Sequence, residues 1–371
     1  MIRLTSALPT RESDHHPYSD SDPRKAMKKV ICVMAVGVLV AAAGAVLLRA
    51  AGMPLWAYGY IDPPPADADY THKCTAAHPV DCARGGTPPD DGRKRTLPGG
   101  AGEWTVTEIA NDYGPVDWYP NDHPKMPEIV AHGAKERGIR ACALCHFPNG
   151  SGKPENAPVA GTSVSYFMNQ MADFKNGLRH TSDKNKANAW EMPVMAAALT
   201  PEETRQAAEY FAAIKYFPKN KVLEATEVPK FAPNANNLFL PAVGNEKVPL
   251  GNRLVEMPND PDDAQNMRNP HSPFTAYVPP GTLQKGEMLA TTGGNGKTIR
   301  CDICHGPGLR GLDPVPAIAG RQASYLARQM YDMQSGARHG VWAPLMKDVV
   351  AKLNEDEIMA LAAYVTSLPP Q

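Results

Sequence analysis

The chain carries one five-residue pattern twice, Cys-Ala-Leu-Cys-His at residues 142–146 and Cys-Asp-Ile-Cys-His at residues 301–305. Two thiols three positions apart on a helical turn can each form a thioether bond to one vinyl group of a haem, and the adjacent imidazole can then bind the iron. A Cys-x-x-Cys pair alone also suits a zinc site or a dithiol redox site, but a histidine directly after both pairs favours haem over zinc. The sequence therefore predicts two covalently attached haem c groups. The predicted attachment residues are Cys142, Cys145, Cys301 and Cys304.

The sequence around the two motifs is itself repeated. Tyr166 aligns with Tyr325, and Arg179 aligns with Arg338, without a gap. The first copy then has five extra residues within residues 181–189, after which the register returns. This pattern indicates a duplicated domain of roughly 90 residues per copy.

Each copy is predicted to be helical. Residues 200–203, Thr-Pro-Glu-Glu, and residues 354–357, Asn-Glu-Asp-Glu, have the capping-box pattern that begins a helix. Apolar residues recur at helical spacing after both caps. Further helices are expected over residues 127–138, 166–175, 283–292 and 325–334.

Each predicted haem iron needs two axial ligands. If the motifs bind haem, His146 and His305 are the proximal ligands. Met192 and Met346 stand at matching positions, each seven residues before the leucine that precedes the last helix. A neutral thioether at these positions favours Fe(II), so the two methionines are the expected distal ligands.

Other distal ligands stay open at this point. Met195 competes with Met192 because the insertion leaves the local loop geometry undetermined. The recurring His180 and His339 would instead give bis-histidine iron, which has a lower potential than His/Met iron. The methionines are also compatible with a purely apolar core, since the chain contains 16 of them.

Four more recurring residues are candidates for haem contacts. Arg179 and Arg338 suit haem propionates, because a planar guanidinium pairs well with a carboxylate; a solvated arginine at a helix end is the alternative. Tyr166 and Tyr325 would donate a hydroxyl to a propionate or pack on the ring.

The N-terminal region predicts a membrane anchor. Residues 30–48 are uncharged and mainly apolar, and as a helix they would span about 28 Å, close to a bilayer core. Four basic residues precede this run, whereas only Arg49 follows it closely, so residues 1–29 are expected in the cytoplasm and the remainder in the periplasm. A cleaved signal peptide is the alternative, although its apolar core is usually shorter. We therefore expect a single-pass inner-membrane protein with periplasmic haem domains.

The sequence does not predict a fold for two proline-rich regions. They are an extension at residues 49–125 and a linker at residues 218–280, which we expect to be irregular. Within the extension, Cys74 and Cys82 suit a small disulfide loop in an oxidising compartment. A metal site with nearby histidines and free thiols are the alternatives.

Both copies resemble class I cytochromes c, with the haem motif on a first helix, a Gly-x-x-x-Ser-Tyr helix, a methionine and a closing helix. The tandem arrangement is similar to the two-domain di-haem cytochromes of bacterial periplasms. The resemblance implies an all-α fold, one haem c per domain at residues 126–217 and 281–371, His/Met coordination and electron transfer. The anchor, the extension and the linker depart from this pattern. So does Phe147, which replaces the glycine that commonly follows the motif and that Gly306 retains.

The expected function is electron transfer rather than catalysis, because six-coordinate iron leaves no open position for a substrate. A net charge of −1 argues against a nucleic-acid partner. We expect a membrane-inserted carrier whose partners are a membrane oxidase or dehydrogenase, or small periplasmic electron carriers. One alternative is a cytochrome subunit of a larger membrane complex, docked through residues 61–125 and 218–280. The other is a di-haem peroxidase or thiosulfate-dehydrogenase-like enzyme, with the open iron position in the first copy.

Overall fold

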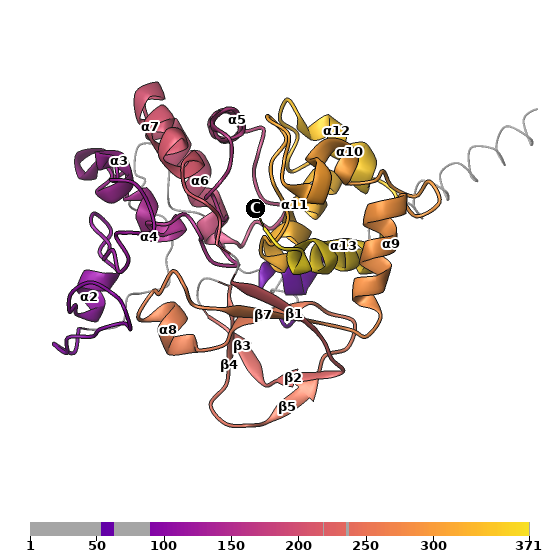
Figure 1. Ribbon diagram of the computed structural model, residues 1–371, viewed down its shortest axis with the longest axis horizontal. Coiled ribbons are helices and arrows are strands. Elements are labelled where there is room, and N and C mark those ends of the chain that lie inside the picture. The colour runs from indigo at the N-terminus through magenta and orange to yellow at the C-terminus, as the bar shows by residue number, and fades with distance from the viewer. Residues whose placement is uncertain (1–52, 63–89, 218, 235–236, 371) are drawn as a thin grey trace, which may run out of the picture. The chain divides into compact units, whose positions relative to one another are not determined.

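The computed structural model describes residues 53–62, 90–217, 219–234 and 237–370. All of these residues belong to one compact unit of the chain, Ala51–Gln371. This unit combines helices with several small β-sheets (Figure 1). The expected all-α fold is therefore wrong, because much of the expected irregular linker pairs as β-strands.

The region around the first motif is helical. Its last helix begins with the predicted capping box: the Thr200 hydroxyl accepts from the Glu203 N–H, and the Glu203 carboxylate accepts from the Thr200 N–H. Buried apolar residues, with Phe211 among the most enclosed, form a separate core for this region. The elements are α3 (Glu128–Ala131), η3 (Lys135–Arg137), α4 (Cys142–His146), α5 (Val164–Lys175), α6 (Ala187–Ala198) and α7 (Pro201–Ala212).

The region around the second motif repeats this plan with a longer first helix. The capping box of Asn354 and Glu357 is confirmed at the start of the last helix. The first and last helices cross at Gly286, where a Cβ would lie 2.1 Å from the Ala360 carbonyl oxygen, so only glycine fits. The elements are α9 (Thr282–Thr292), α10 (Asp302–His305), η4 (Pro307–Leu309), α11 (Ala323–Ser335), α12 (Ala343–Val350) and α13 (Glu355–Ser367).

Seven short strands occupy the expected linker. One sheet has the order β1-β7-β6, with β1 parallel and β6 antiparallel to β7, while β2–β5 and β3–β4 form antiparallel pairs. Strands β2 to β6 each end in a proline, which is tolerated at the end of an edge strand. The prolines therefore shorten these strands without preventing them. The strands are β1 (Asn220–Glu224), β2 (Glu227–Pro229), β3 (Phe231–Pro233), β4 (Phe239–Pro241), β5 (Lys247–Pro249), β6 (Val255–Pro258) and β7 (Phe274–Val278).

The sheets share one apolar core with the second motif region. Strand residues such as Val255 and Val278 belong to the same buried cluster as Leu361 of α13. In Figure 1, β1 and β7 run alongside α13, which they contact. A short helix near the start of the unit, η1 (Leu55–Tyr58), joins this core through Trp56 and Tyr58 and packs on α11.

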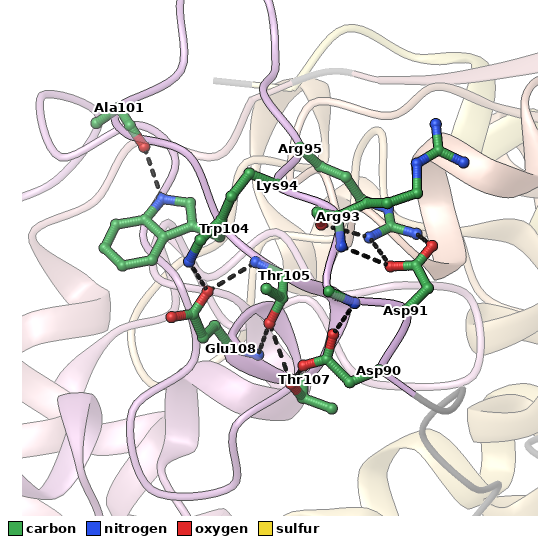
Figure 2. Close-up of polar contacts among 11 residues, drawn as sticks. Asp90, Asp91, Arg93, Lys94, Arg95, Ala101, Trp104, Thr105, Thr107 and Glu108 are labelled. Atoms are coloured by element: carbon green, nitrogen blue, oxygen red, sulfur yellow. Dashed lines mark hydrogen bonds and ion pairs between the residues drawn. The ribbon is translucent and has the colours of Figure 1, made fainter.

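The described part of the extension is organised around α2 (Val106–Ile109) by local polar contacts (Figure 2). Arg95 pairs with Asp91 at 2.9 Å, and Lys94 pairs with Glu108 at 2.6 Å. Exposed ion pairs of this kind are worth only ~0–1 kcal/mol each. They shape the segment locally but contribute little to holding it on the rest of the unit.

A buried tryptophan fixes the extension to a distant segment. Trp118 is almost fully enclosed, and its indole N–H donates to the Met267 carbonyl at 2.7 Å. Met267 follows the short helix α8 (Pro261–Gln265) and belongs to the same small apolar cluster. Burial of an indole outweighs the surface ion pairs, since a large aromatic side chain removes far more apolar area from water.

The predicted membrane anchor at residues 30–48 and the Cys74–Cys82 pair lie outside the described residues. Across the described ranges, no helix is long and apolar enough to cross a bilayer. The longest there, α11 and α13, have 13 residues, whereas a span needs about 20. The expected transmembrane helix and the expected single-pass inner-membrane localisation are therefore not borne out by the described residues.

Candidate haem sites

Each CxxCH motif lines a mainly apolar cavity, and the two cavities are nearly equal in size. Both cysteines and the histidine of the first motif reach the first cavity from α4. Those of the second motif reach the second cavity from α10 and its N-cap residue. An apolar cavity with two thiols and an imidazole at its wall fits a haem bound through thioethers and iron.

The two motif histidines are held in the same orientation. The Nδ1–H of His146 donates to the Ala157 carbonyl at 2.8 Å, and that of His305 donates to the Pro316 carbonyl at 2.8 Å. Burial lowers the pKa of both imidazoles, which favours the neutral form. Each ring therefore keeps Nε2 free as a lone-pair donor, the state in which histidine binds a metal.

Methionines lie in both cavity walls. Met192 and Met195 of α6 line the first cavity, and Met346 of α12 lines the second. Met192 and Met195 are three positions apart on one helix, so they share a face and both reach the cavity. Among the histidines of the other alternative, His180 lines the first cavity, whereas the residues lining the second do not include His339. The four axial-ligand assignments stay predictions.

The two cavities share part of their lining, including Pro158 and Thr162. Tyr166 and Gln170 of α5, together with Tyr325 and Gln329 of α11, line both of them. We call these four residues the shared wall. The sequence marked the two tyrosines as haem contacts but did not assign the glutamines a role. The gapless alignment of the two copies, in which Gln170 matches Gln329, is the sequence feature that could have identified the glutamines.

The two predicted propionate arginines meet at the shared wall. Arg179 donates to the Oε1 atoms of Gln170 and Gln329, both at 2.8 Å. Arg338 donates to the same two oxygens, at 2.8 and 3.1 Å. The Arg338 guanidinium also reaches the Tyr166 hydroxyl at 3.0 Å. This arrangement joins the two copies symmetrically.

These arginines are not surface side chains at helix ends. Arg179 is only 8% exposed, and the backbones of Arg179 and Arg338 pair as an isolated antiparallel bridge. Within the described residues, neither guanidinium has a salt bridge to a carboxylate. Two guanidinium groups that donate to neutral amides and phenols can still donate hydrogen bonds to anionic groups that lie in the cavities.

The two motifs differ in how they are covered. Leu144 is 5% exposed and its carbonyl accepts a hydrogen bond from the Arg268 guanidinium, whereas the equivalent Ile303 is 62% exposed. Phe147 has a φ of 64°, a conformation that favours glycine, which Gly306 provides in the second copy. The ring of Phe147 is buried and lies 5.5 Å from the Arg268 guanidinium, so packing offsets the backbone strain.

The chain matches no protein-family model, but it is similar to curated cytochromes. It is 25% identical over 245 residues to the thiosulfate dehydrogenase electron acceptor of Stutzerimonas stutzeri strain A1501, covering 65% of this chain and 85% of that protein. It is 25% identical over 232 residues to the cytochrome c4 of Azotobacter vinelandii, covering 61% and 84%. It is 35% identical over 75 residues to the cytochrome c-554(548) of Halomonas halodenitrificans, covering 20% of this chain and 90% of that relative.

These relatives agree with the doubled motif and with the paired cavities. The similarity to the cytochrome c4 of Azotobacter vinelandii spans 232 residues, longer than two copies of the repeat, so it supports two haem groups rather than a zinc site. The protein carries two covalently attached haem c groups and transfers electrons. The chain therefore belongs to the c-type cytochromes, as a di-haem member of the family.

Proposed function

We propose that this protein is an electron carrier that passes single electrons between redox proteins, using its two haem sites in sequence. The shared wall carries this proposal, because the same four side chains border both cavities. The two haem domains are proposed to include residues 126–217 and 281–371. The names of the relatives, a cytochrome c4 and an electron acceptor, support a carrier rather than an enzyme.

When bound, each haem supplies an iron that gains or loses one electron. The chain's own residues attach it, ligate it and keep water from its faces. A histidine and a methionine would hold each iron, and keeping both ligands in the two oxidation states would limit the rearrangement that accompanies electron transfer. The proposed axial ligands are His146 and Met192 in the first site, and His305 and Met346 in the second.

The arginine pair at the shared wall is proposed to bind haem carboxylates. Arg179 and Arg338 are held there by Gln170 and Gln329, which can share donors with an incoming carboxylate. Charge-assisted hydrogen bonds from a guanidinium to a carboxylate are about twice as strong as those to a neutral amide. The cluster would therefore neutralise anionic haem groups while holding the two copies together.

The partner is proposed to dock over the second motif. Ile303 and Leu312 are exposed there, and Leu312 packs beside Gly306, directly after the motif. Leu345, also exposed, lines the second cavity. In the first copy, by contrast, Leu144 is covered. An apolar patch at a cavity mouth suits a small, transient interface with another redox protein.

The carrier proposal predicts that the purified protein gains one electron per haem in a coulometric titration. Because side chains fill both axial positions, neither reduced haem should bind carbon monoxide, and the protein alone should oxidise no thiosulfate and reduce no hydrogen peroxide. Difference spectra and turnover assays measure these outcomes. Carbon monoxide binding by one haem together with turnover of either substrate would establish the enzyme alternative instead.

The docking proposal predicts that Ile303→Asn slows electron exchange with a protein partner roughly fivefold to tenfold. Fully burying an isoleucine stabilises a complex by about 1.5–3 kcal/mol, and a transient interface, which buries the side chain incompletely, gains part of this free energy. Stopped-flow mixing of the reduced protein with an oxidised soluble cytochrome c measures the rate. The matched control is Val243→Asn, which changes an equally apolar exposed residue in a turn between strands. Equal rates for wild type and both variants would place docking elsewhere.

A further inference from the structure

The insertion in the first copy places a lysine in the wall of the first haem cavity. Lys186 lies within residues 181–189, the segment that contains the five extra residues, just before α6. Its side chain is only 2% exposed, and it lines the first cavity. The Nζ atom has no hydrogen-bond partner among the described residues. Burying an amine without such a partner lowers the stability of the folded protein, so a lysine at this position is unfavourable for folding alone.

Charged groups face Lys186 from each element around it. Glu155 comes from the loop after the first motif, Asp183 from the insertion itself, and Arg328 and Asp332 from α11 of the second copy. All four of these side chains are buried. The lysine thus lies in a buried polar cluster where the two copies meet.

The nearby carboxylates already have other partners. Glu155 pairs with Lys153 at 2.7 Å. Asp332 accepts from the Tyr58 hydroxyl at 2.8 Å and from the Ser182 hydroxyl at 2.6 Å. Asp183 accepts from the Asn185 N–H at 2.9 Å through Oδ1, and its Oδ2 has no hydrogen-bond partner among the described residues. Lys186 makes no direct hydrogen bond to any of the three carboxylates, so its field extends into the cavity.

We propose that Lys186 is a positioning residue that sets the reduction potential of the first haem by placing a positive charge at its cavity wall. A nearby cation disfavours the oxidised iron, which carries one more positive charge than the reduced iron, so it raises the potential. The second cavity is lined by arginines such as Arg321 and Arg338, but its described lining residues include no lysine, so a cation that can lose its charge near neutral pH distinguishes the first site. The inference rests on the proposed two-haem relay, in which a difference in potential gives electrons a preferred site.

Protonation links this charge to pH. Burial, with a further contribution from Arg328, lowers the pKa of Lys186 to about 7. An electron arriving from a donor protein adds negative charge to the cavity and raises this pKa, so Nζ would take up a proton from water as the site is reduced. The potential should therefore fall as pH rises through neutrality, because the amine then loses its charge.

Lys186→Met tests the proposal, because methionine keeps the unbranched shape without the charge. Near pH 6, at a fixed ambient potential, the reduced-to-oxidised ratio of one haem should fall roughly tenfold, the effect of a unit charge ~10 Å away at an effective dielectric constant of ~20. That haem should also lose its pH dependence between about pH 6 and pH 9. Spectroelectrochemical titration with small mediators measures both quantities, and covalent haem content confirms that the variant is assembled.

Two matched variants separate charge from structure. Lys186→Arg should keep the high potential but lose the pH dependence, since arginine stays protonated throughout this range. Lys184→Met, an exposed lysine of the same insertion, should behave like wild type. Wild-type potentials and pH slopes in Lys186→Met would overturn the proposal, and so would a changed axial-ligand spectrum, which would indicate direct iron ligation. These titrations need no protein partner, so their outcome is independent of whether the carrier proposal holds.

Discussion

Replacing Cys301 and Cys304 together by alanine is expected to give a protein with one covalent haem instead of two, and with a strongly destabilised second motif region. Both thioether bonds to the second haem are lost. Cys301 and Met346 pack against the core that joins this region to the sheets, so an empty cavity there would weaken both. Mass spectrometry and haem staining of the denatured protein count the remaining covalent haem.

The reciprocal double variant provides the matched comparison. Replacing Cys142 and Cys145 by alanine should remove the first haem and destabilise the first motif region, which has its own apolar core. Urea unfolding of this variant, followed at the remaining second haem, should then give an unfolding midpoint for the second region close to that of the wild type. Replacing Cys74 and Cys82 by alanine should leave both haems attached. Two covalent haems in either motif variant would disprove attachment through these motifs.

Local sequence signals predicted several helices of this fold, although not α6 and α12, which carry the candidate methionine ligands. The two capping boxes form as expected because the Thr200–Glu203 and Asn354–Glu357 contacts involve residues only three positions apart. Helix α9, Thr282–Thr292, likewise follows from a short apolar pattern. Contacts of this range need no knowledge of the rest of the chain.

The strands depended on contacts that a linear pattern does not specify. β1 pairs with β7, where Asn220 lies opposite Phe274, and β2 to β6 have only three or four residues each. Segments this short show no clear alternation of apolar and polar residues, and prolines at their ends resemble loop signals. Those prolines mark where the strands β2 to β6 end, and they do not exclude a strand before them.

The candidate sites likewise combine features that the sequence predicts with features that only the structure shows. The motifs and the repeat identified some of the side chains that line each cavity, among them Cys142 in the first and Met346 in the second. They did not show that Gln170 and Gln329 each bind both arginines, because that requires the relative placement of α5 and α11. Phe147 was recognised as a departure from the glycine pattern, but only the structure shows that Arg268 and burial stabilise it.

Met346→Ala is expected to lower the reduction potential of one haem by on the order of 100 mV and to convert its oxidised iron to a high-spin or externally ligated form. A thioether stabilises Fe(II), and alanine offers no replacement ligand. Redox titration and electron paramagnetic resonance measure the potential and the spin state. Met359→Ala is a matched control, because Met359 is buried in the same core but is absent from the cavity lining. If Met346→Ala keeps both signals unchanged, the iron has a different distal ligand.

The first site needs a paired experiment because two methionines line its cavity. Met192→Ala is expected to reproduce the Met346→Ala phenotype, since Met192 holds the matching repeat position. Met195→Ala should leave the spin state intact and reduce stability by about 1–3 kcal/mol, as expected for truncating a partly buried side chain. The reverse result would show that the insertion shifts the ligand by one helical turn. If neither variant changes the iron, His180 is the remaining candidate in the cavity wall, and the first haem would then have the lower potential of bis-histidine coordination.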